Sequence, residues 1–395
     1  MNKERSTKSI VFSILLLLSA LAFFPPAFEL LYHEIGLPYF RTLLICCSFS
    51  FFGLFLLQVF RKTKGFFLVL LNAFILLIFL CFAEFFFYFM NQGSETRQQY
   101  NTDVRTKNHS PLTQPDDVLG HSLKANLDHL STLEIGGKNI YSSLIHSDSL
   151  GHRKTPFDST KNKQAIFLGC SFTFGEGLND EQTLPWLCAQ NSEYNTLNLA
   201  CVGYGPQQAL LQMRSLHLTP DKETKVIYVY IDGHIQRVNG FLSVVNSYGK
   251  DFPYPQLEDN SLVMYPSFSE KSPALASLYA ALKDCQTMQY FNTNLPLFTQ
   301  ERHYELFGKT IEELAREVKK KYNNELVILI YPGSEQHNEV LEHVNINLIQ
   351  VLDYSSLCTK GDEKYFFPKD GHPNALVNQM IARRILKELF NINRN

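Results

Sequence analysis

The sequence lacks the features that mark nucleic-acid-binding and metal-binding proteins. Its 395 residues carry a formal net charge of −2, and no basic patch interleaved with aromatic residues stands out. It has no Cys-x-x-Cys pair and no His-Glu-x-x-His run, the spacings typical of zinc sites. We therefore expect no nucleic-acid partner, no metal and no cofactor.

The eight cysteines fall into two groups along the chain. Three of the eight cysteines, Cys46, Cys47 and Cys81, lie in an apolar N-terminal region. The other five can form disulfides outside the cytoplasm, although their number is odd. Cys170 is either an alternative nucleophile or a small buried side chain.

Phenylalanine is abundant, and most of it falls in the first ninety residues. Three apolar stretches occur there: Ser9–Leu31, Thr42–Phe60 and Phe66–Met90. A helix needs about 20 apolar residues to cross a bilayer. The first stretch is interrupted by Pro25 and Pro26, and a cleavable signal peptide is the alternative there. Residues 1–90 are thus predicted to be a transmembrane region of about three helices.

Basic residues give an orientation for these spans. Lys and Arg precede the first stretch and separate the second from the third, whereas His33–Phe40 contains neither. The positive-inside rule then places everything after Met90 outside the cytoplasm. Glu84, inside the third stretch, is either a functional group or a side chain that reaches the interface or a partner helix.

The remainder resembles a soluble domain. Residues 91–160 are predicted to be a linker, Asn91–His109, and a small β-rich lead-in, Pro111–Pro156. From Gln164 short apolar strands alternate with amphipathic helices, which predicts an α/β fold with a parallel sheet covered on both faces. The predicted strands are Ala165–Leu168, Asn195–Ala200, Lys225–Ile231, Leu326–Tyr331 and Ile346–Leu352. The predicted helices are Thr183–Gln190, Gln207–His217, Thr310–Tyr322 and Ala375–Phe390.

A long insertion breaks this alternation. Residues Asn239–Phe298 contain one candidate helix, Ala274–Cys285. A segment of this length favours a cap over a site rather than a plain loop.

Ligands in such folds bind beyond the carboxyl ends of the strands, so the residues that follow each strand are candidates. Ser171 follows the first strand and suits a nucleophile, the alternative being a helix cap. Gly203 follows the second and can present a backbone N–H to a ligand. His234 and Arg237 follow the third, where they face the crevice or solvent.

A fourth segment, Asp370-Gly371-His372, precedes the last helix. An Asp near a His can orient the imidazole through Nδ1, which leaves Nε2 to take a proton from a Ser. Alone, this segment is also typical of a turn. The four segments together supply a nucleophile, backbone donors, a base and a carboxylate, the components of acyl transfer.

From Gln164 to Phe390 the chain resembles the SGNH-hydrolase superfamily, also called GDSL-like. IFLGCSFTFGEGLNDEQTLP is similar to its first block, NLACVGYGP to its second and DGHPNALVNQMIA to its last. The resemblance implies Ser171 as nucleophile, Gly203 as an oxyanion-hole donor, and His372 as base with Asp370 as its partner. It also implies a three-layer, flavodoxin-like domain over residues 161–395, with a cap insertion at about 239–298.

The sequence departs from the family in two places. The third block usually supplies an Asn to the oxyanion hole, and Gly233-His234 stands there instead. His234 either substitutes as a donor, with the Ser171 and Gly203 N–H groups, or that donor is missing. Asp370 lies two residues before His372, where the family often has three. The shorter spacing resembles a branch that includes polysaccharide O-acetyltransferases.

We therefore expect a serine esterase in the inner membrane of a bacterium, a multi-pass protein with its catalytic domain outside the cytoplasm. Its partners would be membrane lipid and an acylated carbohydrate or lipid substrate, with Thr173 and Arg237 as substrate contacts. The alternatives are an O-acyltransferase acting on an exported polysaccharide, with a membrane partner for acyl transfer, and a catalytically silent binding module.

Overall fold

The structure is a computed structural model that describes residues 13–20, 38–60, 64–93, 112–216 and 223–392. The chain divides into two compact units. One comprises residues 1–101 with 280–293, and the other comprises residues 102–279 with 294–395. The predicted linker, Asn91–His109, lies largely outside the described residues.

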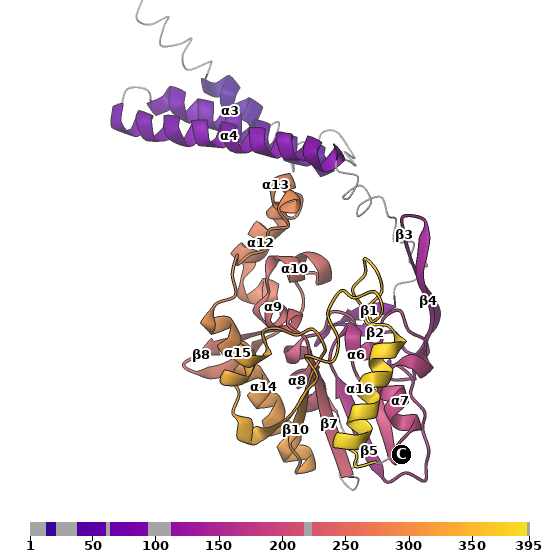
Figure 1. Ribbon diagram of the computed structural model, residues 1–395. Helices are drawn as coiled ribbons and strands as arrows, with labels where there is room; N and C mark the ends of the chain where they lie inside the picture. The colour runs from indigo at the N-terminus through magenta and orange to yellow at the C-terminus, as the bar shows by residue number, and fades with distance from the viewer. Residues whose placement is uncertain (1–12, 21–37, 61–63, 94–111, 217–222, 393–395) are drawn as a thin grey trace, which may run out of the picture. The chain divides into compact units, whose positions relative to one another are not determined.

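A five-stranded parallel sheet forms the centre of the larger unit (Figure 1). Across the sheet the order is β6-β5-β7-β10-β11, the flavodoxin-like order in which the chain winds first to one side of the first strand and then to the other. The strands are β5 (Lys163–Leu168), β6 (Tyr194–Asn198), β7 (Glu223–Tyr230), β10 (Leu326–Ile330) and β11 (Ile349–Asp353). The point where the winding reverses lies at β5, so the fold places its crevice beyond Leu168.

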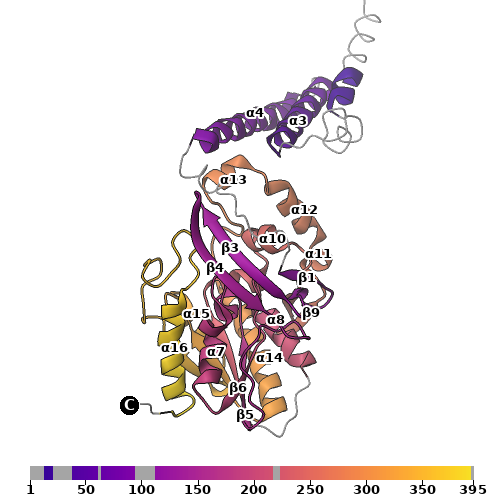
Figure 2. The ribbon, with the colours of Figure 1, turned by 90° about the vertical axis from the view of Figure 1, so that its right-hand side faces the viewer.

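Helices cover both faces of the sheet, which confirms the expected three-layer α/β architecture (Figures 1 and 2). Successive side chains of a strand point to opposite faces. In β5, Ala165 and Phe167 belong to one core cluster, and Ile166 and Leu168 to the other. The first face carries α7 (Leu184–Gln190) and α16 (Ala375–Glu388). The second carries α8 (Pro206–Ser215), α9 (Gly233–Asn239), α14 (Glu301–Tyr322) and α15 (His337–Glu342).

Two elements of the α/β region begin three or more residues away from the predicted position. Residues 346–348 form a short 3-10 turn, η2 (Ile346–Leu348), because the Asn345 side chain accepts the Asn347 N–H and caps it. Helix α14 begins at Glu301 rather than Thr310, since His303 Nδ1 accepts the N–H of Gln300 at 2.9 Å and satisfies an orphan donor.

Two antiparallel hairpins precede the sheet. They consist of β1 (Thr113–Asp116) with β2 (Gly120–Leu123), and of β3 (Asp128–Ile135) with β4 (Lys138–His146). Gly136 and Gly137 join β3 to β4 with φ of 62° and 70°. Two positive φ angles in a two-residue connection match the twist of the paired strands, which explains both glycines.

The insertion between α9 and α14 has secondary structure of its own. It contains α10 (Leu242–Tyr248), the hairpin of β8 (Tyr254–Glu258) and β9 (Ser261–Tyr265), α11 (Phe268–Lys271), α12 (Pro273–Leu282) and α13 (Gln286–Tyr290). Residues 280–293, including α13, cluster with the N-terminal helices rather than with the sheet. The predicted helix Ala274–Cys285 is therefore shorter, and its end belongs to another compact unit.

The smaller unit contains α3 (Pro38–Phe60) and α4 (Lys64–Gly93), which pack together. Among the described residues, one helix is long and apolar enough to cross a membrane, by length and composition, over Phe67–Asn91. In α3 the described apolar helix is only Cys47–Leu57, and of the first predicted stretch only residues 13–20 are described as helical. Of the three expected membrane spans, the described residues therefore support one, and a multi-pass arrangement is not supported.

Glu84 in α4 contacts α13, one of the two outcomes expected for it. Its carboxylate accepts the backbone N–H groups of Gln286 at 2.7 Å and Thr287 at 2.9 Å, and the Cys285 thiol at 2.9 Å. Phe87, one turn along α4, packs against Tyr290 with ring centroids 4.7 Å apart. A carboxylate in an apolar helix is costly unless donors surround it, and α13 supplies those donors.

Candidate active site

Ser171 lies at the carboxyl end of the central strand. Gly169, directly after β5, has a φ of 149°, and an added Cβ there would lie 2.3 Å from Thr173 Oγ1. The close turn makes Ser171 the first residue of the short helix α6 (Ser171–Phe174). Ser171 thus sits at the crevice that the strand order defines.

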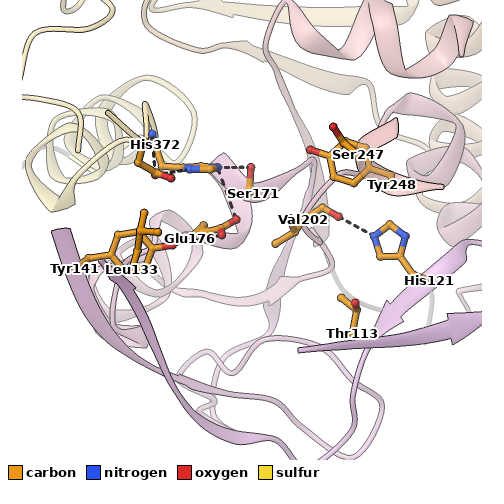
Figure 3. A pocket seen from close by; sticks show the side chains of 11 residues that line it. Thr113, His121, Leu133, Tyr141, Ser171, Glu176, Val202, Ser247, Tyr248 and His372 are labelled. Carbon is orange, nitrogen blue, oxygen red and sulfur yellow. Dashed lines mark hydrogen bonds and ion pairs between the residues drawn. The ribbon is translucent and has the colours of Figure 1, made fainter. Parts of the chain in front are cut away.

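His372, from the other end of the sequence, lies beside Ser171 (Figure 3), and Asp370 contacts its ring. His372 Nε2 lies 2.8 Å from Ser171 Oγ, and Nδ1 lies 2.6 Å from Asp370 Oδ2. A carboxylate can only accept at Nδ1, so Nδ1 carries the proton and Nε2 accepts the Ser171 hydroxyl in the neutral imidazole. This tautomer is the one that takes a proton from a serine.

The turn before His372 explains how Asp370 reaches the ring from only two residues away. Lys369 and Gly371 have φ of 61° and 80°, so the chain folds back on both sides of Asp370. Asp370 Oδ2 also accepts the backbone N–H of His372 at 3.3 Å, and the Phe367 N–H donates to the His372 carbonyl at 2.8 Å. The same carboxylate oxygen therefore fixes the backbone and the ring.

A second carboxylate, which the sequence reasoning missed, lies beside the imidazole. Glu176 Oε2 is 3.7 Å from His372 Nε2, and the Tyr141 hydroxyl donates to Glu176 Oε1 at 3.4 Å. The Glu176 residue is only 6% exposed. A lone Glu between two glycines gives no local signal of this role, because its neighbour in space, His372, is distant in sequence.

These carboxylates shift the proton affinity of His372. Burial alone lowers the pKa of this imidazole, but the hydrogen bond to Asp370 and the charges of Glu176 and Asp370 outweigh burial and raise it above its usual value. The cation of Arg237 acts in the opposite direction. The site therefore stabilises the imidazolium that forms when His372 accepts a proton.

Ser171 and His372 open into a pocket of about 590 Å³, within the usual size range for small-molecule sites. In Figure 3, Ser171 lies between His372 and Glu176 on one side and Tyr248 and Ser247 on the other. Its walls come from the two hairpins, from α10 of the insertion and from the strand ends. The lining residues are Thr113, His121, Leu133, Tyr141, Ser171, Glu176, Val202, Ser247, Tyr248, Asp370 and His372.

The second glycine turn lies against α10. Gly203 has a φ of 83°, and an added Cβ would meet Tyr248 Cε1 at 2.4 Å. His121 Nε2 lies 2.7 Å from the Val202 carbonyl, and the Tyr204 hydroxyl donates to the His121 carbonyl at 2.6 Å. These bonds join the β1–β2 hairpin to the turn that carries Gly203.

Two predicted side chains lie in the core and do not reach the pocket. His234 is fully buried, its Nδ1 lies 2.7 Å from the Tyr228 hydroxyl, and burial lowers its pKa well below the usual value. Thr173 is also fully buried, beneath the Gly169 turn. The expectations that His234 completes an oxyanion hole and that Thr173 contacts substrate are therefore wrong. The inward face of each short helix places these side chains in the core.

Arg237 has a supporting position rather than a place in the pocket lining. Its Nη1 donates to the Tyr204 carbonyl at 2.8 Å, and its guanidinium lies 5.6 Å from the centre of the Tyr248 ring. Arg237 therefore braces the Gly203 turn against α10.

Cys170, the alternative nucleophile, is fully buried, so its thiol cannot meet a substrate. In the part of the chain that the structure describes, the cysteines are free thiols and no group of three or more His, Cys, Asp or Glu could hold a metal ion.

No protein-family model and no curated protein matches the chain. Solved structures do match part of the chain. The chain is similar to a member of the lipolytic protein G-D-S-L family from Veillonella parvula DSM 2008, with 14% identity, coverage of 58% of this chain and 100% of that chain, and a TM-score of 0.34. It is also similar to a carbohydrate esterase family 2 enzyme with a carbohydrate-binding domain from Corynascus thermopiles (Myceliophthora fergusii), with 12% identity, coverage of 65% and 72%, and a TM-score of 0.34.

Proposed function

We propose that this protein is a membrane-anchored serine esterase that cleaves acyl esters, with acetylated carbohydrate as the preferred substrate class. The observation that carries the proposal is the 2.8 Å contact of Ser171 Oγ with His372 Nε2, combined with the 2.6 Å contact of Nδ1 with Asp370. A hydroxyl, an oriented imidazole and a buried carboxylate in this sequence form the arrangement that activates a serine nucleophile.

The reaction proceeds in two halves. In the first, His372 takes the Ser171 proton while Oγ attacks the ester carbonyl, and the backbone N–H groups of Ser171 and Gly203 stabilise the oxyanion. The ester C–O bond then breaks, and His372 returns the proton to the leaving alcohol. In the second, water attacks the acyl-serine and gives its proton to His372, which passes it to Ser171 Oγ as the acid leaves.

The pocket lining favours a carbohydrate. Four of its lining residues carry a hydroxyl, Thr113, Tyr141, Ser247 and Tyr248, and two of the four are aromatic. Aromatic faces and hydroxyls suit the apolar faces and polar edges of a sugar. A long acyl chain would need a more apolar channel.

The anchor is the α4 span. Arg61, Lys62 and Lys64 precede this span, which favours its amino-terminal end on the cytoplasmic side. The larger unit would then lie outside the cytoplasm, where membrane lipid and envelope carbohydrates are its partners.

The proposal is tested with the full-length protein in detergent, acetylated sugars and a fluorophosphonate that labels activated serines. Acetate release and labelling of Ser171 are expected, both lost in Ser171→Ala, with kcat reduced roughly 10⁴–10⁶-fold. If the wild type shows neither acetate release nor labelling of Ser171, the protein is instead a catalytically silent binding module.

Assays with and without an added glycan acceptor distinguish hydrolysis from transfer. An acyltransferase would release little acetate alone and would move the acyl group to an added polysaccharide, whereas a hydrolase would release acetate at a rate independent of the acceptor. The transferase alternative also implies a membrane partner that delivers the acyl group.

A further inference from the structure

Glu176 is built into the pocket by its two neighbours. Gly175 and Gly177 have φ of 88° and 79°, so the chain turns sharply on both sides of the carboxylate. An added Cβ would lie 2.6 Å from Thr183 Cγ2 at the first glycine and 2.7 Å from Phe367 Cε2 at the second. Side chains at these positions would displace the turn, so its shape depends on glycine.

The carboxylate is held in place by contacts of its own. The Glu176 N–H donates to the Ser171 carbonyl at 3.0 Å, and the Tyr141 hydroxyl donates to Oε1 at 3.4 Å. Below the turn, Arg153 Nη1 donates to the Phe174 and Gly175 carbonyls at 2.8 and 2.6 Å. Glu176 is therefore fixed relative to the nucleophile without any substrate.

The position of Glu176 determines which part of a bound substrate lies next to its carboxylate. When the acyl-serine forms, His372 Nε2 must return its proton to the leaving oxygen, so the leaving alcohol has to lie against Nε2. Glu176 Oε2 is 3.7 Å from that same nitrogen. The leaving alcohol and any incoming hydroxyl therefore pass directly beside this carboxylate.

The charged residues that line the pocket also support a role for Glu176 in substrate recognition. Its lining includes the carboxylates of Glu176 and Asp370 and no Lys or Arg among the residues described. Asp370 is engaged with His372, so Glu176 presents the negative charge nearest the leaving group. Glu176 lines the pocket together with Ser171 and His372, so a ligand bound there lies within reach of its carboxylate.

We propose that Glu176 determines specificity for the leaving alcohol: it accepts a hydrogen bond from a hydroxyl or ammonium group beside the ester and rejects alcohols that carry a carboxylate or phosphate there. This inference rests on the proposed esterase function and narrows its substrate to esters of neutral or amino sugars. Glu176 acts through recognition, and Ser171 and His372 perform the chemistry.

The test compares three acetyl esters that differ only in the alcohol: a neutral sugar, an amino sugar and a uronic acid. Full-length wild type, Glu176→Gln and Glu181→Gln are assayed for kcat/KM on each. Glu181 is the matched control, because it is an exposed carboxylate on the neighbouring turn η1 (Asp180–Gln182) and does not line the pocket.

Wild type and Glu181→Gln should both prefer the neutral and amino sugar esters over the uronate ester. Glu176→Gln keeps an acceptor oxygen but loses the charge, so the ratio of uronate to neutral kcat/KM should rise about tenfold or more. An unchanged ratio in a Glu176→Gln variant that still hydrolyses the neutral ester would overturn the proposal.

Labelling of Ser171 separates this proposal from the proposed function. Neutral and carboxylated phosphonate probes are compared, so no turnover is needed. A discrimination against the anionic probe that disappears in Glu176→Gln supports the role of Glu176. Labelling that is equal for both probes in wild type refutes that role while the esterase function stands, and no labelling of Ser171 at all refutes both.

Discussion

Arg153 and Asp180 form a fully enclosed ion pair, with Nε 2.9 Å from Oδ1 and side chains 0% and 5% exposed. Arg153 also donates to the carbonyls of Phe174, Gly175 and Leu178, the last at 2.5 Å. Burial lowers the pKa of this guanidinium, and the neighbouring carboxylate opposes that effect. Arg153 thus holds the backbone on both sides of Glu176.

Arg153→Met should destabilise the larger unit by about 3–5 kcal/mol, because it removes the cation beside the buried Asp180 carboxylate and the guanidinium donors of three carbonyls. Arg214→Met is the control, since Arg214 is partly exposed and its ion pairs with Glu313 and Glu317 are 3.9 Å long. Urea denaturation followed by near-ultraviolet circular dichroism measures both variants. Equal stability of the two would show that the buried pair contributes nothing.

Gly203→Ala should reduce kcat by roughly 10²–10³, the effect of losing one oxyanion donor, because its new methyl group would displace the turn from Tyr248. Gly249 is a matched control. It has the same φ of 83°, but nothing lies within 4 Å of an added Cβ. If Gly249→Ala lost as much activity, backbone strain rather than the contact with Tyr248 would be responsible.

Activity should fall as the medium becomes acidic, through an apparent pKa above 6.5. Catalysis needs neutral His372, and Asp370 and Glu176 together raise its pKa despite burial and Arg237. The protonated, inactive form therefore persists to higher pH than for an ordinary histidine. A pH profile of kcat/KM measures this limb, and Glu176→Gln should move it toward lower pH. An acid limb with an apparent pKa below 6.5 in wild type would contradict the raised pKa of His372.

Asp370→Asn should lower kcat on the order of 10⁴ while KM changes little, because an amide that donates to Nδ1 selects the wrong imidazole tautomer. Steady-state kinetics at a pH well above the acid limb measure this effect without interference from protonation. Retention of more than a tenth of the activity would show that another group orients His372.

Much of the larger unit could be predicted from the sequence because its signals are local. Strands such as Val226–Tyr230 are buried on both faces and read as continuous apolar runs. Ser171, Gly203 and His372 follow strands or precede a helix, where parallel topology gathers residues at one edge. These signals need no knowledge of long-range packing.

The rest of the fold and of the site could not be predicted, because it depends on contacts between segments that are distant in the sequence. Glu176 and Tyr141 acquire their roles from a hairpin that lies against the strand ends, and a hairpin's own sequence does not say where it docks. The prediction that His234 faces the crevice is wrong because its position within one helical turn decides whether it faces the crevice or the core. The partner of Glu84 was equally hidden, since α13 follows it by some two hundred residues.

Glu84→Ala should release residues 285–291 from α4. The carboxylate accepts two backbone N–H groups and the Cys285 thiol, and an alanine leaves all three donors unpaired near the end of the apolar span. In membranes that contain the full-length protein, a water-soluble maleimide should then label Cys285 several-fold faster, as read by mass spectrometry of the Cys285 peptide. Asn72→Ala is the control within the same helix, because the Asn72 amide donates within α4, to the Leu68 carbonyl. Equal labelling rates in wild type and Glu84→Ala would mean that the packing of Phe87 against Tyr290 is enough to hold this segment.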